Sequence, residues 1–140
     1  MSFFILDNSK HSTLEAALDS GSWVIACLCA EWCGSCREYG EQFAALAQRH
    51  PQHHFVWIDI EDEADLVGDL DVDNFPTLLI QHGGTVAFFG TVKPDIQLAD
   101  RLFKAQRDKS PEELMRDARA SAEHVRWQEE CNLQTRLRGG

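Results

Sequence analysis

A run of eight apolar residues, Trp23 to Ala30, constrains the fold of this chain more than any other feature. The run follows Gly21 and is rich in residues that favour strands, which is typical of a strand buried on both faces. Such a strand needs a covering layer on each side of its sheet. A transmembrane helix needs about 20 apolar residues, so the run is too short to span a bilayer. It therefore predicts an α/β fold built around this strand.

The rest of the chain alternates between strand and helix patterns. Helical spacing of apolar residues separates the expected strands, and Gly83-Gly84 between the last two strands predicts a hairpin. Strands separated by helices pair in parallel, whereas a hairpin is antiparallel. We predict a mixed central sheet with helices on both faces. The expected strands cover residues 3–6, 23–29, 55–60, 77–80 and 86–89, and the expected helices lie near 12–18, 37–50, 63–70 and 94–103.

The last thirty residues carry their own helix-start signal. Ser110-Pro111-Glu112-Glu113 combines an N-cap residue, a proline at the first helical position and acidic residues in the first turn. We expect one weakly amphipathic helix from there to about Leu133. The predicted organisation is a domain over residues 1–107 and a C-terminal helical extension over 108–140. The sequence leaves open whether the extension packs on the domain or binds a partner, and we expect it to be dispensable for the chemistry.

The charge distribution excludes some partners. The 140 residues have a net charge of −10, and residues 1–100 carry 4 basic against 16 acidic side chains. A body this acidic repels a phosphate backbone, so we expect no nucleic-acid partner. Seven acidic residues between Glu61 and Asp73 are either a solvated surface or a surface that attracts a basic protein partner. No secretory signal pattern is visible after Met1, so the expected location is cytoplasmic, without membrane binding.

Four of the five cysteines lie between Cys27 and Cys36. Cys33 and Cys36 are three residues apart where the buried strand gives way to a helix, so their side chains face the same way at a spacing that suits a disulfide. Unpaired N–H groups at a helix N-terminus stabilise a thiolate, which is the attacking species in disulfide exchange. The alternative is a pair of buried, inert cysteines. The context favours redox chemistry.

Two separated motifs resemble the thioredoxin family. The segment from Ala30 to Cys36 is similar to its active-site motif, with Ser35 where proline is usual, and Asn74-Phe75-Pro76-Thr77 is similar to its cis-proline loop. Gly83-Gly84 matches the hairpin turn, and Gly90 matches a glycine beside the substrate groove. The resemblance covers about residues 3–107. It implies a thioredoxin fold with a mixed central sheet, to which this chain adds a C-terminal helix.

The resemblance also implies a mechanism. Cys33, the more exposed cysteine, would attack a substrate disulfide, and Cys36 would resolve the mixed disulfide, leaving an oxidised Cys33–Cys36 pair as the redox-active group with no further cofactor. The activity would be that of a protein-disulfide reductase in cell redox homeostasis and electron transport. Its partners would be protein disulfide substrates and a flavin-dependent electron donor of the thioredoxin-reductase type.

The residues that would bind substrate surround this pair. By resemblance, Trp32 forms an apolar wall beside Cys33, and Pro76, if cis, exposes the backbone of Phe75 so that a substrate strand can pair with it. An ordinary edge-strand proline is the alternative for Pro76. The expected substrate-binding residues are Trp32, Gly34, Ser35, Phe75, Pro76 and Gly90.

Three residues depart from the family pattern and are candidate modulators. Cys27 falls where the family places a buried aspartate that assists proton transfer, Cys29 where it usually places tryptophan, and Trp57 where many members carry lysine. Cys27 and Cys29 share one face of the strand, where they would be packing residues. A four-thiolate metal site with Cys33 and Cys36 is disfavoured because a straight strand resists convergence of the sulfurs, so we expect no metal. A further alternative makes Cys27 a third redox thiol that pairs with Cys36.

Three classes of function follow from these patterns. The first is a thiol-disulfide oxidoreductase that works through Cys33 and Cys36. The second is a binding or chaperone-type protein that keeps the fold and uses its acidic surface and C-terminal helix to hold a client. The third is a metal-bound structural module. Reduction of insulin disulfides distinguishes the first two, and metal analysis of the purified protein tests the third.

Overall fold

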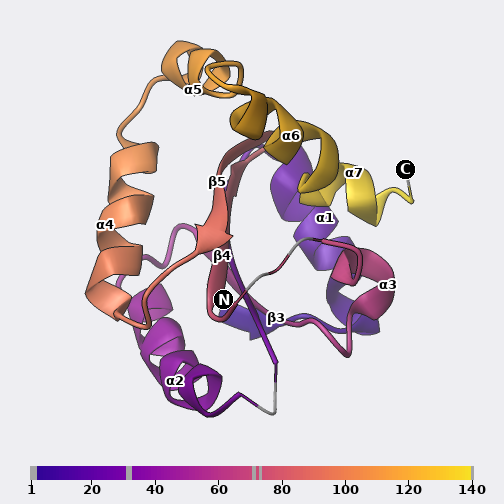
Figure 1. The fold of residues 1–140 in the computed structure, drawn as a ribbon, viewed down its shortest axis with the longest axis vertical. Coiled ribbons are helices and arrows are strands. Elements are labelled where there is room, and N and C mark those ends of the chain that lie inside the picture. Colours follow the sequence, from indigo (N-terminus) through magenta and orange to yellow (C-terminus); the bar gives the residue numbers. More distant parts are fainter. Residues whose placement is uncertain (1–2, 31–32, 71, 73, 140) are drawn as a thin grey trace.

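The computed structural model describes residues 3–30, 33–70, 72 and 74–139. A five-stranded sheet forms its centre, in the order β1-β3-β2-β4-β5 (Figure 1). The first three strands in this order run parallel to one another, and β4 is antiparallel to both of its neighbours. The predicted mixed sheet is therefore confirmed. The strands are β1 (Phe3–Ile5), β2 (Trp23–Cys29), β3 (His54–Asp59), β4 (Thr77–His82) and β5 (Thr85–Thr91).

Helices cover both faces of the sheet (Figure 1). A 3-10 turn (Asn8–Lys10) leads into the first α-helix, and the helices are α1 (His11–Asp19), α2 (Gly34–Gln48), α3 (Ala64–Val67), α4 (Ile96–Arg107), α5 (Pro111–Asp117), α6 (Ala122–Glu130) and α7 (Leu133–Leu137). On one face α2 packs beside α4. On the other face α1 contacts α7 and α6 contacts β5, while α3 adds buried side chains to the same core as α1. Within the described residues, no helix combines the length and hydropathy needed to cross a membrane.

The central strand β2 joins the two layers because all of its residues are buried. Successive side chains of a strand point to opposite faces of the sheet. The core under α1 and α3 therefore takes one set of alternating β2 residues, and the core under α2 and α4 takes the other: Val24, Ala26 and Leu28 in the first, and Trp23, Ile25, Cys27 and Cys29 in the second. Two cysteines of β2 thus face α2, as the spacing predicts.

The C-terminal segment forms three helices where one was expected. The predicted helix start at Ser110 is confirmed and forms a capping box, since the Ser110 hydroxyl accepts from Glu113 N and the Glu113 side chain accepts from Ser110 N. Two further caps interrupt the helix, because the Ser121 side chain accepts from His124 N and the Asn132 side chain accepts from Gln134 N. Each N-cap starts a new helix in a new direction. The expectation of a single helix from 110 to 133 is wrong for this reason.

The three helices pack on the sheet domain. Leu133 is fully buried and Cys131 is 5% exposed, and both belong to the core beneath α1. A polar cluster fastens this segment to β4: Gln81 Nε2 donates to Asn132 Oδ1 (2.7 Å), and Gln81 Oε1 accepts from Leu133 N (2.9 Å). Asn132 Nδ2 in turn donates to Gly84 O in the hairpin turn (3.0 Å). We call Gln81, Gly84, Asn132 and Leu133 the Gln81–Asn132 cluster.

The tail also covers the exposed edge of the sheet. Strand β5 is an edge strand, with backbone groups that lack a neighbouring strand. Gln128 of α6 satisfies one residue of this edge, because its Oε1 accepts from Val86 N (2.8 Å) and its Nε2 donates to Val86 O (2.7 Å). Residues 108–139 are therefore packed on the domain, which is one of the two alternatives that the sequence leaves open. Because they complete this core, we expect their removal to unfold the domain, contrary to the sequence-based expectation that they are dispensable for the chemistry.

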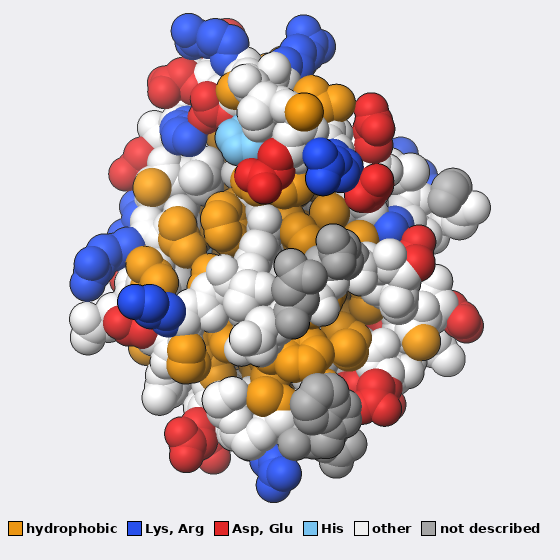
Figure 2. Space-filling view, in the orientation of Figure 1, with side chains coloured by type: hydrophobic (Ala, Val, Ile, Leu, Met, Phe, Trp, Pro, Cys, Tyr) orange, Lys and Arg blue, Asp and Glu red, His pale blue; other side chains and the backbone are white. Residues whose placement is uncertain are grey.

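Charged groups lie mainly around the rim of the face drawn in Figure 2, and hydrophobic side chains gather near its middle. Two acidic side chains of the segment after β3 pair with basic side chains from other parts of the chain. Glu63 is 5% exposed and pairs with His11, and the Asp69 carboxylate receives Arg136 Nη1 at 2.7 Å. Arg136 also donates to Leu66 O, so this acidic segment is tied to the C-terminal tail. Glu61 and Asp65, by contrast, are exposed.

Candidate active site

The two candidate catalytic cysteines lie at the junction of β2 and α2. Cys33 is the N-cap residue of α2, with extended backbone angles, and its N–H donates to Ala30 O at 3.0 Å. Cys36 is in the first turn and is 1% exposed, whereas Cys33 is partly exposed. The difference in exposure matches the expected roles of attacking and resolving cysteine. Gly34 between them has open space where a Cβ would lie.

The Cys33 thiol is placed to ionise easily. Its Sγ lies 3.2 Å from Ser35 Oγ. That hydrogen bond is the main reason why the pKa of Cys33 lies below its ordinary value, and the Cys36 and Ser35 N–H groups and the charge of Arg37 act in the same direction. These interactions favour the thiolate over the thiol. Cys33 is therefore more nucleophilic near neutral pH than an ordinary surface cysteine.

The disulfide in the structure differs from the expected one. Cys36 is bonded to Cys29, across a Cα–Cα distance of 5.8 Å, and Cys33 is a free thiol. Cys29 is the last residue of β2 and faces α2, and the first turn of α2 brings the buried Cys36 over it. A Cα separation of this size is typical of a disulfide. Cys33 instead turns its sulfur toward Ser35.

Cys27 lies deeper on the same face of β2. It is fully buried and free, and its Sγ is 3.9 Å from Cys29 Sγ. Burial raises its pKa far above the ordinary value, so the thiol is neutral. Tyr39 is also buried, and its hydroxyl has no hydrogen-bond partner among the residues that the structure describes. The space behind the disulfide thus holds uncharged groups where the family places an aspartate.

No metal site accompanies these cysteines. Within residues 3–30, 33–70, 72 and 74–139, no group of three or more His, Cys, Asp or Glu side chains is placed to hold a metal ion. Two of the four sulfurs that could form a thiolate site are joined in the disulfide.

An apolar hollow of about 430 Å³ opens beside Cys36. The Trp57 indole forms one wall and lies flat against α2 where Gly40 has no side chain, since a Cβ there would be 3.4 Å from the ring. Asp59, two residues after Trp57 on β3, also lines this hollow, and its Oδ1 accepts from Glu61 N (2.9 Å) and Asp62 N (3.2 Å) in the following turn. Sequence reasoning missed Asp59, although its alternation with Trp57 places it on the same face. The hollow is lined by Phe3, Ile5, Ala30, Cys36, Arg37, Gly40, Glu41, Ala44, Trp57 and Asp59.

The second motif forms a loop that leads into β4. The Phe75–Pro76 peptide bond is cis, and Pro76 O accepts from Val92 N at 3.0 Å. Thr77 Oγ1 donates to Asn74 O at 2.7 Å, which closes the loop. Phe75 and Cys33 both pack against the core under α2 and α4. Trp32, the expected apolar wall, lies outside the described residues.

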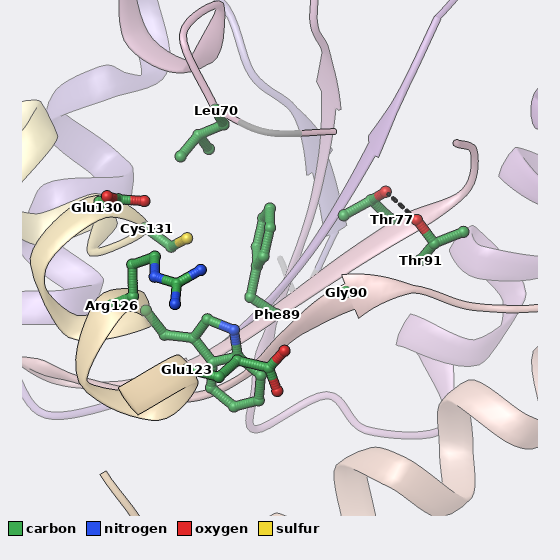
Figure 3. A pocket seen from close by; sticks show the side chains of 10 residues that line it. Leu70, Thr77, Phe89, Gly90, Thr91, Glu123, Arg126, Glu130 and Cys131 are labelled. Carbon is green, nitrogen blue, oxygen red and sulfur yellow. Dashed lines mark hydrogen bonds between the residues drawn. The ribbon is translucent and has the colours of Figure 1, made fainter. Parts of the chain in front are cut away.

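Gly90 lines a pocket of about 200 Å³ that sequence reasoning did not anticipate (Figure 3). The pocket extends from Thr77, directly after the cis-proline, across β5 to helix α6 of the tail. In Figure 3 the Arg126 side chain lies between Cys131 and Phe89. The sequence gives no signal for this pocket because its two sides come from distant segments: Leu70, Thr77, Phe89, Gly90 and Thr91 on one, and Glu123, Arg126, Trp127, Glu130 and Cys131 on the other.

Comparison with known proteins identifies the family. A family model described as Thioredoxin matches residues 6–103 of this chain, which is well over half of it. The chain belongs to the thioredoxin family. Thioredoxins are protein-disulfide oxidoreductases that use an active-site disulfide without a further cofactor, so this protein is a thiol-disulfide oxidoreductase.

Individual thioredoxins share both sequence and fold with the chain. Thioredoxin H4-1 of Oryza sativa subsp. japonica is 32% identical over 93 residues, which are 65% of this chain and 70% of the relative. A Thioredoxin H-type protein of Picea mariana is 30% identical over 88 residues, or 61% and 70% of the two chains. The crystal structure of a wild-type poplar thioredoxin h superposes with a TM-score of 0.68 at 19% identity, covering 79% of this chain and all of that one. The thioredoxin fold is thus confirmed.

Proposed function

We propose that this thioredoxin-family protein reduces protein disulfides with Cys33 as the nucleophile and Cys36 as the resolving thiol. The Cys33 thiolate attacks one sulfur of the substrate disulfide and releases the other substrate sulfur as a thiolate. The Cys36 thiolate then attacks Cys33 Sγ and releases the second substrate thiolate. The substrate gains two electrons, and the protein is left with a Cys33–Cys36 disulfide.

The environment of Cys33 is the observation that carries this proposal. Of the five cysteines, Cys33 alone has a pKa that is lowered by its surroundings while its sulfur is open to a substrate. Cys36 follows one turn later in the same helix and is shielded from solvent. An exposed thiolate beside a buried partner supports a two-step exchange.

The substrate surface would lie around this thiol. We assign substrate contact to Trp32, Gly34 and Ser35 on the side of α2, to Phe75 and Pro76 in the facing loop, and to Gly90 in the neighbouring pocket. The open space at Gly34 supports close approach of a substrate backbone. Cys27 and Trp57 would act as modulators, because they stand behind the reactive pair and set the polarity around it. Residues 1–107 would carry the chemistry, and residues 108–140 would support the sheet and border the pocket.

The electron donor and the compartment complete the proposal. A solved thioredoxin f2 that resembles this chain, with a TM-score of 0.65 at 19% identity over 76% of this chain and 96% of that one, is in complex with ferredoxin:thioredoxin reductase. We infer a reductase of the thioredoxin-reductase type as the donor here. Three free thiols, Cys27, Cys33 and Cys131, suit a reducing compartment, and we place the protein in the cytoplasm. The acidic side chains of Glu61 and Asp65 are exposed and would be available to bind a basic protein partner.

Reduction of insulin disulfides tests the proposal. We expect activity in the wild type, none in Cys33→Ser, and a trapped substrate adduct on Cys33 in Cys36→Ser. Gln134→Ala is the control, because its side-chain bond to Asp19 Oδ1 lies at the surface away from the candidate catalytic cysteines and the pocket, and it is expected to leave the activity unchanged. Insulin reduction that persists in Cys33→Ser would exclude Cys33 as the nucleophile. A wild type that holds reduced clients without reducing insulin would favour the binding class of function.

A further inference from the structure

Cys36 has two cysteines within reach, on two different elements. Cys33 precedes it by three residues at the start of α2, and Cys29 ends the strand beneath it. The structure joins Cys36 to Cys29 and leaves Cys33 as a free, partly exposed thiol. The Cys29–Cys36 disulfide is thus compatible with β2 and α2 as the structure places them.

We propose that Cys29 is a third redox thiol, which displaces Cys33 from Cys36 and so converts the Cys33–Cys36 disulfide into a buried Cys29–Cys36 disulfide. The inference rests on the proposed function, because the Cys33–Cys36 disulfide formed by substrate reduction is its starting point. The oxidised protein then has a closed interior pair and an open nucleophile at Cys33.

The conversion is an internal thiol–disulfide exchange. The Cys29 thiolate attacks Cys36 Sγ, the Cys29–Cys36 bond forms, and the Cys33–Cys36 bond breaks with its electron pair leaving on Cys33 Sγ. One disulfide is present before and after, so no oxidant or reductant is consumed. The proton lost by Cys29 passes to water.

The groups around Cys33 favour this direction of exchange. Exchange is faster when the leaving sulfur is the more acidic one. Cys33 leaves into the hydrogen bond with Ser35 Oγ and toward the N–H groups at the start of α2, which stabilise its thiolate. Cys29, by contrast, is 1% exposed and gains little from remaining ionised. The exchange therefore favours the buried Cys29–Cys36 disulfide, with the negative charge on Cys33 at the surface.

Cys27 provides a contrast with Cys29 on the same face of β2. Both are buried and their sulfurs are 3.9 Å apart, but only Cys29 is bonded to Cys36. Cys27 lies two residues further from α2's first turn and pairs in register with Leu78 and Trp57, deep in the sheet. The structure thus assigns Cys29 the redox role and Cys27 the packing role.

The buried disulfide changes what the oxidised protein can do. With Cys36 occupied, a substrate sulfur that bonds to Cys33 has no resolving thiol beside it. The Cys33 thiolate of the oxidised protein would then attack a substrate disulfide, release one substrate sulfur as a thiolate and keep the other in a lasting mixed disulfide, whereas the fully reduced protein releases both. The same chain would act as a dithiol reductase and as a single-thiol acceptor, according to its redox state.

Peptide mapping of the oxidised full-length protein tests the inference. Reduced protein is oxidised with no more than one insulin disulfide per molecule, so that little substrate disulfide remains to bond to Cys33, and is then quenched in acid, alkylated in denaturant with a maleimide, and cleaved after glutamate. Cleavage after Glu15, Glu31 and Glu38 separates peptide 16–31, which carries Cys27 and Cys29, from peptide 32–38, which carries Cys33 and Cys36. We expect the two peptides to be linked by a disulfide and Cys33 to carry the maleimide.

Two variants and one labelling measurement make the test specific. Cys27→Ala should keep the linked peptides, whereas Cys29→Ala should show only a loop within peptide 32–38. A maleimide added to the native oxidised protein should label one site, Cys33, in the wild type and none in Cys29→Ala. A wild type with only the internal loop and no labelled Cys33 would overturn the inference, as would loss of the linkage in Cys27→Ala instead.

The failure of the proposed function gives a different result. If the wild type leaves insulin intact, the reductase proposal fails. Oxidation by a diazene oxidant such as diamide then tests the third redox thiol by itself: linked peptides support it, and a loop within peptide 32–38 alone excludes it. If insulin is reduced and the map shows only the loop within peptide 32–38, the reductase proposal stands and the third redox thiol is excluded.

Discussion

Replacement of Gln81 by leucine tests how firmly the tail is fastened to the sheet. Gln81 is fully buried on β4, and its side chain makes three hydrogen bonds: to Asn132 Oδ1 at 2.7 Å, to Gly83 O at 2.9 Å and from Leu133 N at 2.9 Å. Gln81→Leu has a similar size and is apolar. It removes the polar contacts of the Gln81–Asn132 cluster with little change in volume.

The expected cost follows from the partners that remain. Leu133 N–H is left buried without an acceptor, at about 1–3 kcal/mol. Asn132 Oδ1 keeps its bond from Gln134 N (3.0 Å), and Gly83 O lies in the hairpin turn where water can replace the lost donor, so these two add less. The free energy of unfolding should fall by about 2–4 kcal/mol. At roughly 4 °C per kcal/mol for a chain of this length, the melting temperature should fall by about 8–16 °C.

Urea unfolding followed by tryptophan fluorescence measures the loss. The matched control is Gln134→Ala, whose side-chain bond to Asp19 Oδ1 lies at the surface and should contribute about 0.5 kcal/mol or less. The rate of Cys33 alkylation should be the same in both variants, because neither touches the site. A Gln81→Leu variant no less stable than Gln134→Ala would refute the reasoning, since the hydrogen bonds of the buried cluster would then contribute nothing to the free energy of unfolding.

Three further predictions concern the thiols and the tail. Ser35→Ala should raise the pKa of Cys33, so that iodoacetamide alkylation slows near neutral pH and its pH profile moves upward; an unmoved profile contradicts the role of the hydroxyl. The pKa of Cys33 is lower in the folded protein than in the unfolded chain. The Cys33 thiolate therefore stabilises the fold above the ordinary cysteine pKa, and this stabilisation is lost as the pH falls through the pKa of the folded protein. Ser35→Ala should thus destabilise the protein more in alkali than in acid. Cys27→Asp should speed release of the second substrate thiolate near neutral pH in rapid-quench assays, by supplying a proton acceptor behind Cys36, at a stability cost of several kcal/mol because the buried carboxylate must be ionised to accept the proton. Equal release rates would show that proton transfer does not limit this step. Truncation after Lys109 should expose the core beneath α1 and abolish cooperative melting in circular dichroism, and a truncated protein that melts like the full chain would contradict the packing described here.

The redox site was largely predictable because its determinants are local. The apolar run before the cysteines, the three-residue spacing and the helix start after Cys33 all lie within one short segment, and the N-cap position of Cys33 follows from them. The alternation along β2 also places Cys27 and Cys29 on the face of α2. Neither pattern says which sulfur lies nearest Cys36, because that depends on the distance between the strand end and the first turn of α2.

The sequence by itself determined the order of strands and helices, the closing hairpin at Gly83-Gly84 and the helix start at Ser110, since each depends on near neighbours in the chain. The tertiary structure alone decided that the tail returns to the sheet, because Gln81 and Val86, the partners of Asn132 and Gln128 in this packing, lie more than forty residues away. The pairing of Cys36 belongs with these features. Spacing along the chain favours Cys33, and only the packing of α2 on β2 brings Cys29 within bonding distance.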